Sequence, residues 1–311
     1  MSDEQRLLVH RSSLIAPSSS FIAHRSSFIA HRSSLIAHRS SLIAHLSSFI
    51  SHRSSLIAHL SSLSMWFPEQ YERFAAERRQ PFVDLAALIE PRPNMRIVDL
   101  GCGTGELTRE LHESLAAEET VGVDSSETML LKAGHFGGEM LRFEKGNIEA
   151  FVTDRPYDLI FSNAALQWVP DHERLFVRLT NFLAMNGQLA IQMPANDSHP
   201  SHRVAAALAQ DFGLAPREDF VLPVEKYAEL LHHLGYKRQH VRMQVYGHVL
   251  PSAADVVEWV RGALLTHYQS LLSPERFDEF LAEYRTRLHT ALGDQRPFFY
   301  TYRRVLLWGT F

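Results

Sequence analysis

The 311-residue sequence lacks the features that mark several large classes of protein. It contains one cysteine, Cys102, which excludes an internal disulfide and a multi-cysteine metal site and is typical of a reducing cytoplasm. No apolar run approaches the roughly 18 to 20 residues of a membrane-spanning helix. The net charge of −4 gives no electrostatic reason to expect nucleic-acid binding. We therefore expect a cytoplasmic protein, monomeric, with neither a nucleic acid nor a membrane as its partner.

Two common functional motifs are also missing. None of the eighteen histidines belongs to a His-Glu-x-x-His pair, so nothing in the sequence compels a metal site, and we predict none. The sequence has no Gly-Lys-Ser/Thr triplet, which excludes a phosphate-binding P-loop.

The first part of the chain is a repeat. From His10 to Met65 the sequence runs in eight heptads in one phase, most of them variants of HRSSLIA. Residues 1–64 hold six of the 31 basic side chains and only two of the 35 acidic ones, so the composition changes sharply after them. We predict a low-complexity heptad-repeat tail at 1–64 and a single domain at 65–311.

Four interpretations of the repeat compete. A coiled coil requires apolar residues three and four apart, whereas here three apolar residues are adjacent and serines fill the rest. Histidines seven residues apart would lie about 10 Å apart along a helix, too far to share one metal ion. A transit peptide fits the composition, but near-identical copies are not what targeting selects. We favour the fourth, a disordered or artefactual segment translated from a short DNA repeat upstream of a start at Met65.

The domain has the alternating pattern of an α/β protein. Apolar runs typical of strands lie at 94–101, 120–124, 140–147, 157–163 and 187–194, and segments with helical spacing lie at 106–116, 127–134 and 172–183. This alternation predicts a doubly wound, mostly parallel sheet. Ligands bind such sheets at the carboxyl ends of the strands, so the loops that follow the five runs form the candidate site. After Pro194 the pattern predicts a helical cap around 200–222 and 251–294, and then a terminal strand at 298–311.

The loop after the first strand has three alternate glycines, Gly101, Gly103 and Gly105. Because glycine lacks a Cβ atom, such a loop can turn sharply and approach a ligand closely. A dinucleotide fingerprint needs a glycine where Glu106 stands, which disfavours a nicotinamide-dependent oxidoreductase. Asp99, just before the loop, would repel a pyrophosphate and attract a cationic ligand.

Asp124 ends the second predicted strand. A carboxylate at this point can accept two hydrogen bonds from a ribose diol. It could equally cap the next helix, but Ser125 or Ser126 can supply that cap and leave Asp124 free for the ribose.

Together these residues resemble the class I S-adenosylmethionine-dependent methyltransferases. The resemblance rests on four strand-end segments in order: DLGCGTG at 99–105, GVDSSETM at 122–129, GNIE at 146–149 and DLIFSNAALQWVPD at 158–171. It implies S-adenosyl-L-methionine as the cofactor, with a Rossmann-like fold. The cofactor-binding residues that it implies are Asp99, Gly101, Cys102, Gly103, Gly105, Asp124, Ser125, Met129, Asn147, Ile148 and Asn163. Asn147 departs from the aspartate of many relatives, but its amide still offers the adenine amine an acceptor.

A narrower resemblance, to trans-aconitate methyltransferase-like proteins, covers most of residues 65–311. It rests on segments at 66–81, 158–176, 190–196 and 251–265, of which QWVPDH at 167–172 is the most telling. It implies methyl-ester formation on a carboxylate of a small tricarboxylic acid. Such a carboxylate is already ionised at neutral pH, so we predict no catalytic base and a mechanism of orientation and desolvation.

A polyanionic substrate needs cationic donors and a closed site. The arginine candidates are Arg78, Arg79, Arg303 and Arg304, with His172 and His248 as weaker ones, and each competes with a plain surface or core role. Trp66, Tyr71 and Trp168 are candidates for an aromatic wall over the sulfonium. The predicted substrate-binding set is Trp66, Tyr71, Arg78, Gln167, Trp168, His172 and Arg303.

Other functions remain open. A methyltransferase for an oxygen or nitrogen nucleophile, on a metabolite or a carrier-bound acid, would need a base, for which His172 or Tyr71 are the candidates. A non-catalytic protein that binds S-adenosylmethionine would have the same glycine loop and Asp124. A flat pH profile of methylation would favour the carboxylate.

Overall fold

The computed structural model describes residues 75–311, with side chains from Arg79 onward. The predicted tail at 1–64, Trp66, Tyr71 and the side chain of Arg78 lie outside the described residues.

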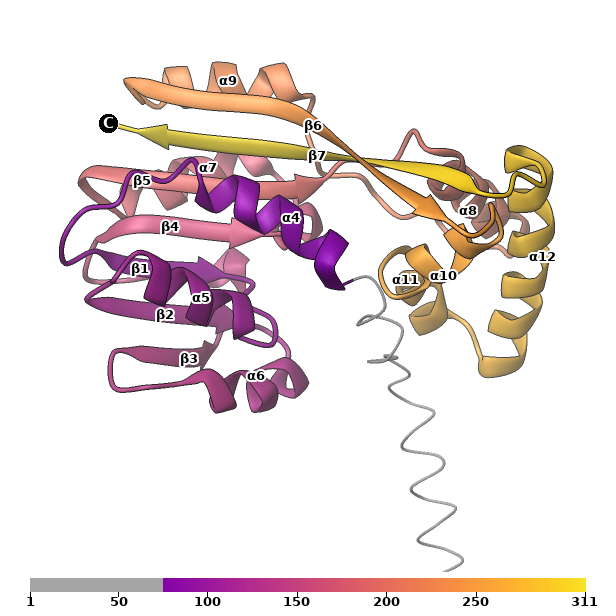
Figure 1. The fold of residues 1–311 in the computed structure, drawn as a ribbon, viewed down its shortest axis with the longest axis horizontal. Coiled ribbons are helices and arrows are strands. Elements are labelled where there is room, and N and C mark those ends of the chain that lie inside the picture. The colour runs from indigo at the N-terminus through magenta and orange to yellow at the C-terminus, as the bar shows by residue number, and fades with distance from the viewer. Residues whose placement is uncertain (1–74) are drawn as a thin grey trace, which may run out of the picture. The chain divides into compact units, whose positions relative to one another are not determined.

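A seven-stranded sheet forms the centre of the domain (Figure 1). Its strands are β1 (Arg96–Leu100), β2 (Glu119–Asp124), β3 (Leu141–Lys145), β4 (Tyr157–Asn163), β5 (Leu183–Pro194), β6 (Arg238–Leu250) and β7 (Phe298–Thr310). They are arranged in the order β3-β2-β1-β4-β5-β7-β6, and β7 alone runs antiparallel to its neighbours β5 and β6. The predicted doubly wound, mostly parallel sheet is thereby confirmed.

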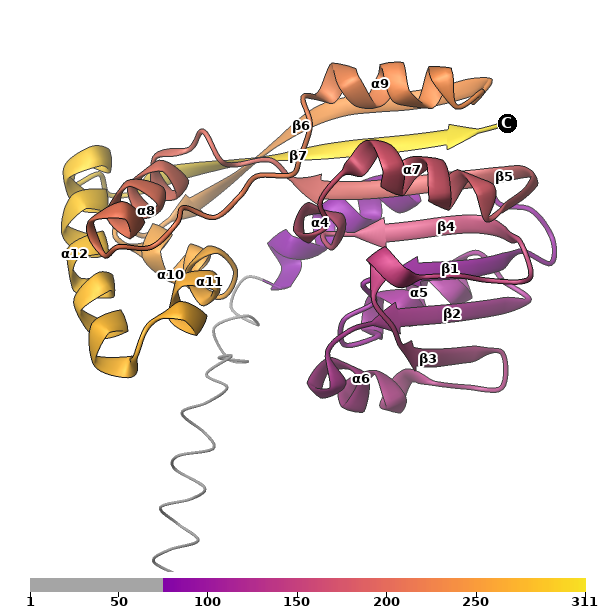
Figure 2. The ribbon, with the colours of Figure 1, turned by 180° about the vertical axis from the view of Figure 1, so that it is seen from behind.

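Helices cover both faces of this sheet. α7 (His172–Asn181) and α9 (Val224–His233) pack on one face with Val98 and Leu100 of β1, and Figure 2 shows these two helices in front. α4 (Ala75–Ala86) and α5 (Glu106–Ser114) pack against the other face, towards which Ile97 points. Successive side chains of a strand point to opposite faces, so Asp99 points to the side of α5. α6 (Glu127–Ala133) lies against β2 and β3.

A second apolar core joins four helices to the ends of β6 and β7. The helices are α8 (Pro200–Asp211), α10 (Asp255–Arg261), α11 (Leu264–Leu271) and α12 (Pro274–Leu292). They lie beyond the carboxyl ends of β4 and β5 (Figure 1). The start of α12 is set by Ser273, whose hydroxyl accepts the Arg276 N–H at 3.3 Å, and by Pro274 at the first turn. The helical insertion predicted after the fifth strand is present in the fold.

Three elements differ from the sequence expectation. The sequence pattern missed the helices α4 and α9 and the 13-residue strand β6. β6 is an edge strand and bears Arg, Gln and His side chains, several of them exposed, so it lacks the apolar run that marks the inner strands.

Candidate active site

The glycine loop links the carboxyl end of β1 to α5. All three glycines have positive φ, +82° at Gly101, +57° at Gly103 and +80° at Gly105. The N–H groups of Gly101 and Cys102 both donate to the carbonyl of Val123, at 2.8 and 3.1 Å, which fastens the loop to β2. The left-handed conformation at three alternate positions explains why the loop needs glycine.

The three glycines have different surroundings. A Cβ atom on Gly101 would lie 2.1 Å from the Cβ of Ala165, and one on Gly105 would lie 2.7 Å from the ring of Phe143. A Cβ atom on Gly103 would meet no atom of the described chain within 4 Å. Gly101 and Gly105 therefore serve internal packing, whereas Gly103 faces open space in which a ligand can approach the backbone.

Asp124 at the end of β2 is tied to this loop. Its Oδ2 accepts the N–H of Gly103 at 2.9 Å, and its Oδ1 accepts the N–H of Ser126 at 2.8 Å. The expectation of a free carboxylate is therefore wrong in one respect, because both oxygens already hold the backbone. Ser126, not Ser125, caps α6, with Oγ accepting the N–H of Met129 at 3.3 Å. Each carboxylate oxygen has a second lone pair, so Asp124 can still accept hydroxyl protons.

Asp99 is buried beneath the loop, with 4% of its surface exposed. Thr108 donates to its Oδ2 at 2.6 Å, while Oδ1 has no hydrogen-bond partner among the described residues. Burial, and to a smaller extent the charge of Asp124, raise the pKa of Asp99 to about 7. A cationic group close to Asp99 would restore the ionised form and relieve this cost of burial.

Cys102 is also buried, and burial is the main cause that raises the pKa of its thiol above the ordinary value. A thiol of this kind is unreactive. Cys102 can therefore contribute to the site through its backbone and its volume, and not as a nucleophile.

The loop after β3 borders the glycine loop. Asn147 caps a short 3-10 turn, Ile148–Ala150, by accepting the N–H of Glu149 at 2.8 Å. The Cδ1 of Ile148 lies 3.8 Å from the position of a Cβ atom on Gly101. On the neighbouring loop Ser125 is exposed and Met129 is half-buried. These side chains share one edge of the sheet, as the sequence predicted from the ends of its strands.

Polar groups follow the end of β4 as well. The Oδ1 of Asn163 and the Oε1 of Gln167 are buried and have no hydrogen-bond partner within the described part of the chain. The Nε2 of Gln167 donates to the carbonyl of Ala164 at 2.8 Å. Trp168, by contrast, is 47% exposed. The segment thus presents two unused acceptors and one exposed aromatic ring beside the glycine loop.

His172 does not belong to the substrate site. It is 2% exposed, its Nδ1 lies 2.5 Å from the hydroxyl of Tyr227, and its Nε2 lies 2.9 Å from the carbonyl of Leu166. Burial lowers the pKa of His172. Both ring nitrogens are occupied by the protein, so we withdraw His172 as a substrate ligand and as a candidate base.

Two of the arginine candidates already have partners within the protein. Arg303 donates from Nη2 to the hydroxyl of Ser198 at 2.6 Å and from Nε to the carbonyl of Ala195 at 3.2 Å, so it braces the loop after β5. Arg79 forms an ion pair with Glu110 of α5. Of the remaining candidates, Arg304 lies with its guanidinium carbon 5.1 Å from the ring centre of Tyr302, and His248 stacks on the same ring at 4.9 Å.

Arg217 was not among the residues predicted from the sequence. Its Nη2 lies 3.0 Å from Oδ1 of Asp197, and its guanidinium carbon lies 5.1 Å from the centre of the Trp168 ring. The partners are distant in sequence, and the segment around Arg217 has no periodic pattern, so no local signal distinguishes it from a surface arginine.

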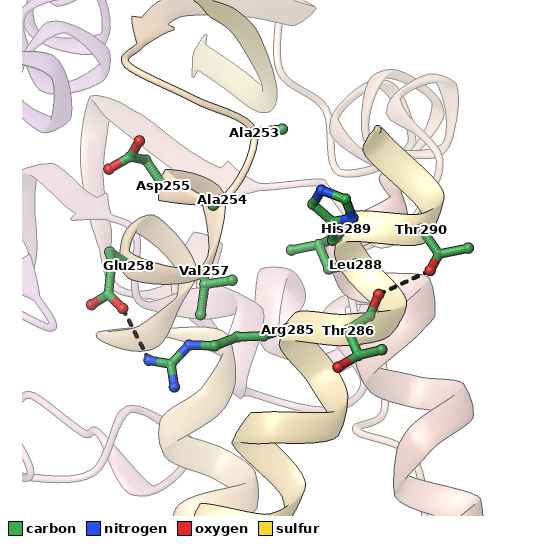
Figure 3. Close-up of a pocket in the computed structure, with 10 residues that line it drawn as sticks. All are labelled: Ala253, Ala254, Asp255, Val257, Glu258, Arg285, Thr286, Leu288, His289 and Thr290. Atoms are coloured by element: carbon green, nitrogen blue, oxygen red, sulfur yellow. Dashed lines mark hydrogen bonds and ion pairs between the residues drawn. The ribbon is translucent and has the colours of Figure 1, made fainter. Parts of the chain in front are cut away.

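A separate cavity of about 640 Å³ opens between α10 and α12 (Figure 3). Arg285 crosses it to pair with Glu258 at 3.3 Å. It contains none of the predicted site residues.

No described helix is both long and apolar enough to cross a membrane. Among the described residues, no group of three or more His, Cys, Asp or Glu side chains is arranged so that it could hold a metal ion.

The site can be compared with known proteins. Residues 91–234 match the model of a methyltransferase domain. The chain is 42% identical to trans-aconitate 2-methyltransferase from Deinococcus radiodurans, over 79% of this chain and 98% of that protein. It is 39% identical to the protein of the same name from Variovorax paradoxus, over 73% of this chain and 90% of that one. The solved structure of the YcgJ protein from Bacillus subtilis has the same fold, with a TM-score of 0.52 at 15% identity, covering 75% of this chain and 98% of that one.

Proposed function

Because this chain belongs to the trans-aconitate 2-methyltransferase family of S-adenosylmethionine-dependent methyltransferases, we propose that its substrate is a small polycarboxylic acid of the trans-aconitate type. It converts one carboxylate of this acid into a methyl ester. The cofactor, S-adenosyl-L-methionine, supplies the methyl group from its sulfonium.

The main support for the proposed cofactor site is the open space at Gly103, which Asp124 borders. The donor set fits the nucleoside. Asp124 can accept from the ribose hydroxyls, and Oδ1 of Asp99 and Oδ1 of Asn163 are unused acceptors suited to an ammonium. Ser125, Met129, Asn147 and Ile148 would border the adenine, on the side of β2 and β3.

The protein residues orient the substrate and do not activate it chemically. A carboxylate with a pKa near 4 is ionised at neutral pH and attacks without a base. The site must exclude water from the substrate carboxylate. It must also hold the attacking oxygen on the line of the S–CH₃ bond, about 3 Å from the methyl carbon. We assign this role to Gln167 and Trp168, which lie in the 3-10 turn after β4. The burial of His172, with both nitrogens engaged, argues against this residue as the base of the alternative reaction.

The experiment that tests the proposal is product analysis by mass spectrometry. The full chain, given S-adenosylmethionine and trans-aconitate, should release S-adenosylhomocysteine and a monomethyl ester that alkali hydrolyses. A methylated product stable to alkali would indicate an ether or amine and contradict the proposed substrate. The absence of product with every small acid tested would contradict the proposed reaction.

We also propose that the protein acts as a monomer in the cytoplasm. The supporting observation is the single cysteine, which suits a reducing compartment and is buried, so it is not exposed to form a disulfide between two copies. Light scattering of the purified full chain would test the monomer, and a mass of twice 35.5 kDa would contradict it.

A further inference from the structure

Arg217 joins three segments that lie far apart in the sequence. Its guanidinium pairs with Asp197 at 3.0 Å and lies over the ring of Trp168 at 5.1 Å. Its backbone N–H points to the hydroxyl of Tyr268 in α11, at 3.5 Å. A cation held by an ion pair, an aromatic face and a backbone contact has a defined position, which a solvated surface arginine lacks.

This position is at the carboxyl end of the sheet. Trp168 follows the end of β4, and Asp197 follows the end of β5. β4 pairs with β1, whose end carries the glycine loop. The loop and the segment after β4 are in contact, because Ala165 fills the space beside Gly101. Arg217 therefore stands over the strand ends on which the methyl-transfer site is built.

The surroundings of Arg217 leave part of its hydrogen-bonding capacity unused. Its side chain is 15% exposed and that of Asp197 is 31% exposed. Among residues 79–311 its guanidinium makes one hydrogen bond, from Nη2, although a guanidinium has five N–H donors in a planar fork. Burial, and after it the charge of Asp197, raise the pKa of Asp219, a second carboxyl near Arg217. Through its unused N–H donors, Arg217 can bind a carboxylate of the substrate beside Asp197.

We propose that Arg217 is a specificity-determining residue that binds a non-reacting carboxylate of the substrate, with Asp197 and Trp168 fixing its guanidinium. This inference rests on the proposed function, because it assumes an acid with more than one carboxylate. Arg217 then recognises the part of the substrate that is not methylated. Arg and carboxylate pair bidentately, which gives geometric selectivity as well as attraction.

The test is the kinetics of Arg217→Met in the full chain. Loss of a charge-assisted pair with a non-reacting group should raise KM for trans-aconitate about 10- to 100-fold. The value of kcat should change little, because such a contact is equally strong in the ground and transition states. The affinity for S-adenosylhomocysteine should stay within about twofold. An unchanged KM, or a weakened affinity for the nucleoside, would overturn the inference.

Three dicarboxylates sharpen the test. Itaconate, mesaconate and glutaconate each lack a different carboxylate of trans-aconitate, and each is measured as a substrate or as a competitive inhibitor. For the one that lacks the partner of Arg217, wild type and variant should bind equally. Equal losses for all four acids would indicate a purely structural role and overturn the inference.

Two further variants separate folding from recognition. Arg217→Lys retains a charge for Asp197 but loses the planar fork, so it should fold and show a smaller rise in KM. Arg285→Met removes a more exposed ion pair, with Glu258, in the separate cavity of Figure 3, and should leave KM unchanged. A similar rise in KM in Arg285→Met would overturn the assignment to Arg217. If wild type methylates no small acid, the proposed function itself fails, whereas normal wild-type turnover with an unaffected Arg217→Met contradicts only the inference.

Discussion

Ala165 occupies the space beside Gly101 where a side chain would project, and a Cβ atom on Gly101 would lie 2.1 Å from that of Ala165. The glycine loop is thereby locked against the segment that follows β4. Gly103, two residues later, has no such neighbour in the described chain. The two glycines should consequently respond to the same substitution in different ways.

Gly101→Ala should destabilise the fold, and Gly103→Ala should mainly weaken cofactor binding. The clash with Ala165, added to the positive φ, should lower the free energy of unfolding by about 3 kcal/mol in Gly101→Ala. Gly103→Ala has only its backbone conformation to strain, and should lose about 1 kcal/mol of stability. Urea denaturation and titration with S-adenosylhomocysteine measure the two effects. Equal stability losses would show that the loop is not packed as described.

Asp124→Ala should weaken binding of S-adenosylhomocysteine by about 1 to 3 kcal/mol. It removes the acceptor that fixes the N–H of Gly103, together with the acceptors proposed for the ribose. Glu127→Ala, three residues away, removes an exposed ion pair with Lys145 and serves as the matched control. Titration calorimetry should show a loss in the first variant alone, and unchanged affinity of Asp124→Ala would refute the cofactor assignment.

Asp99→Asn should remove a pH dependence of stability. The pKa of Asp99 is raised from 3.8 to about 7, so between these values the folded protein holds a proton that the unfolded chain releases. The contribution of Asp99 to the free energy of unfolding is therefore fully present below pH 3.8. It is lost as the pH rises towards about 7, at about 1.4 kcal/mol per pH unit. The asparagine does not titrate. Urea denaturation of the cofactor-free proteins should show the variant gaining on wild type from about pH 5 to about pH 7.5. A constant difference would mean that Asp99 ionises normally.

The rate of methyl transfer should not depend on pH near neutrality. With both substrates saturating, kcat should be constant from about pH 6 to 8, because the attacking carboxylate is ionised throughout. Stopped assays with a buffer series measure this. A tenfold increase in kcat per pH unit over part of that range would indicate a general base and favour an oxygen or nitrogen nucleophile.

Removal of residues 1–64 should leave folding and cofactor affinity unchanged. The prediction follows from the repetitive composition of this segment, which precedes all four motif segments, at 99–105, 122–129, 146–149 and 158–171. Thermal melting and titration of residues 65–311 against the full chain measure it. An insoluble protein, or one that cannot bind the nucleoside, would show that the tail has a structural role.

The sequence predicted the inner strands and the strand-end loops because both have local signals. The buried run at 96–100 is followed at once by alternate glycines, and Asp124 closes the next strand. These features depend on neighbours in the chain. The edge strand β6 has no comparable signal, because an exposed edge carries polar side chains at many positions.

The substrate side of the site was harder to predict because its contacts are long-range. His172 and Trp168 are near in sequence, yet one is buried between Tyr227 and a carbonyl and the other is half exposed. The importance of Arg217 arises from Asp197 and Trp168, which only the folded chain brings to it. Arg303 was chosen for its charge, but in the fold its Nε and Nη2 hold the loop after β5.

The most direct test is the crystal structure of the full chain with S-adenosylhomocysteine and trans-aconitate bound. The nucleoside should lie against Gly103 and Asp124, with its sulfur facing a carboxylate oxygen across the space of one methyl group. A nucleoside bound elsewhere, or an acid with no carboxylate directed at the sulfur, would contradict this prediction.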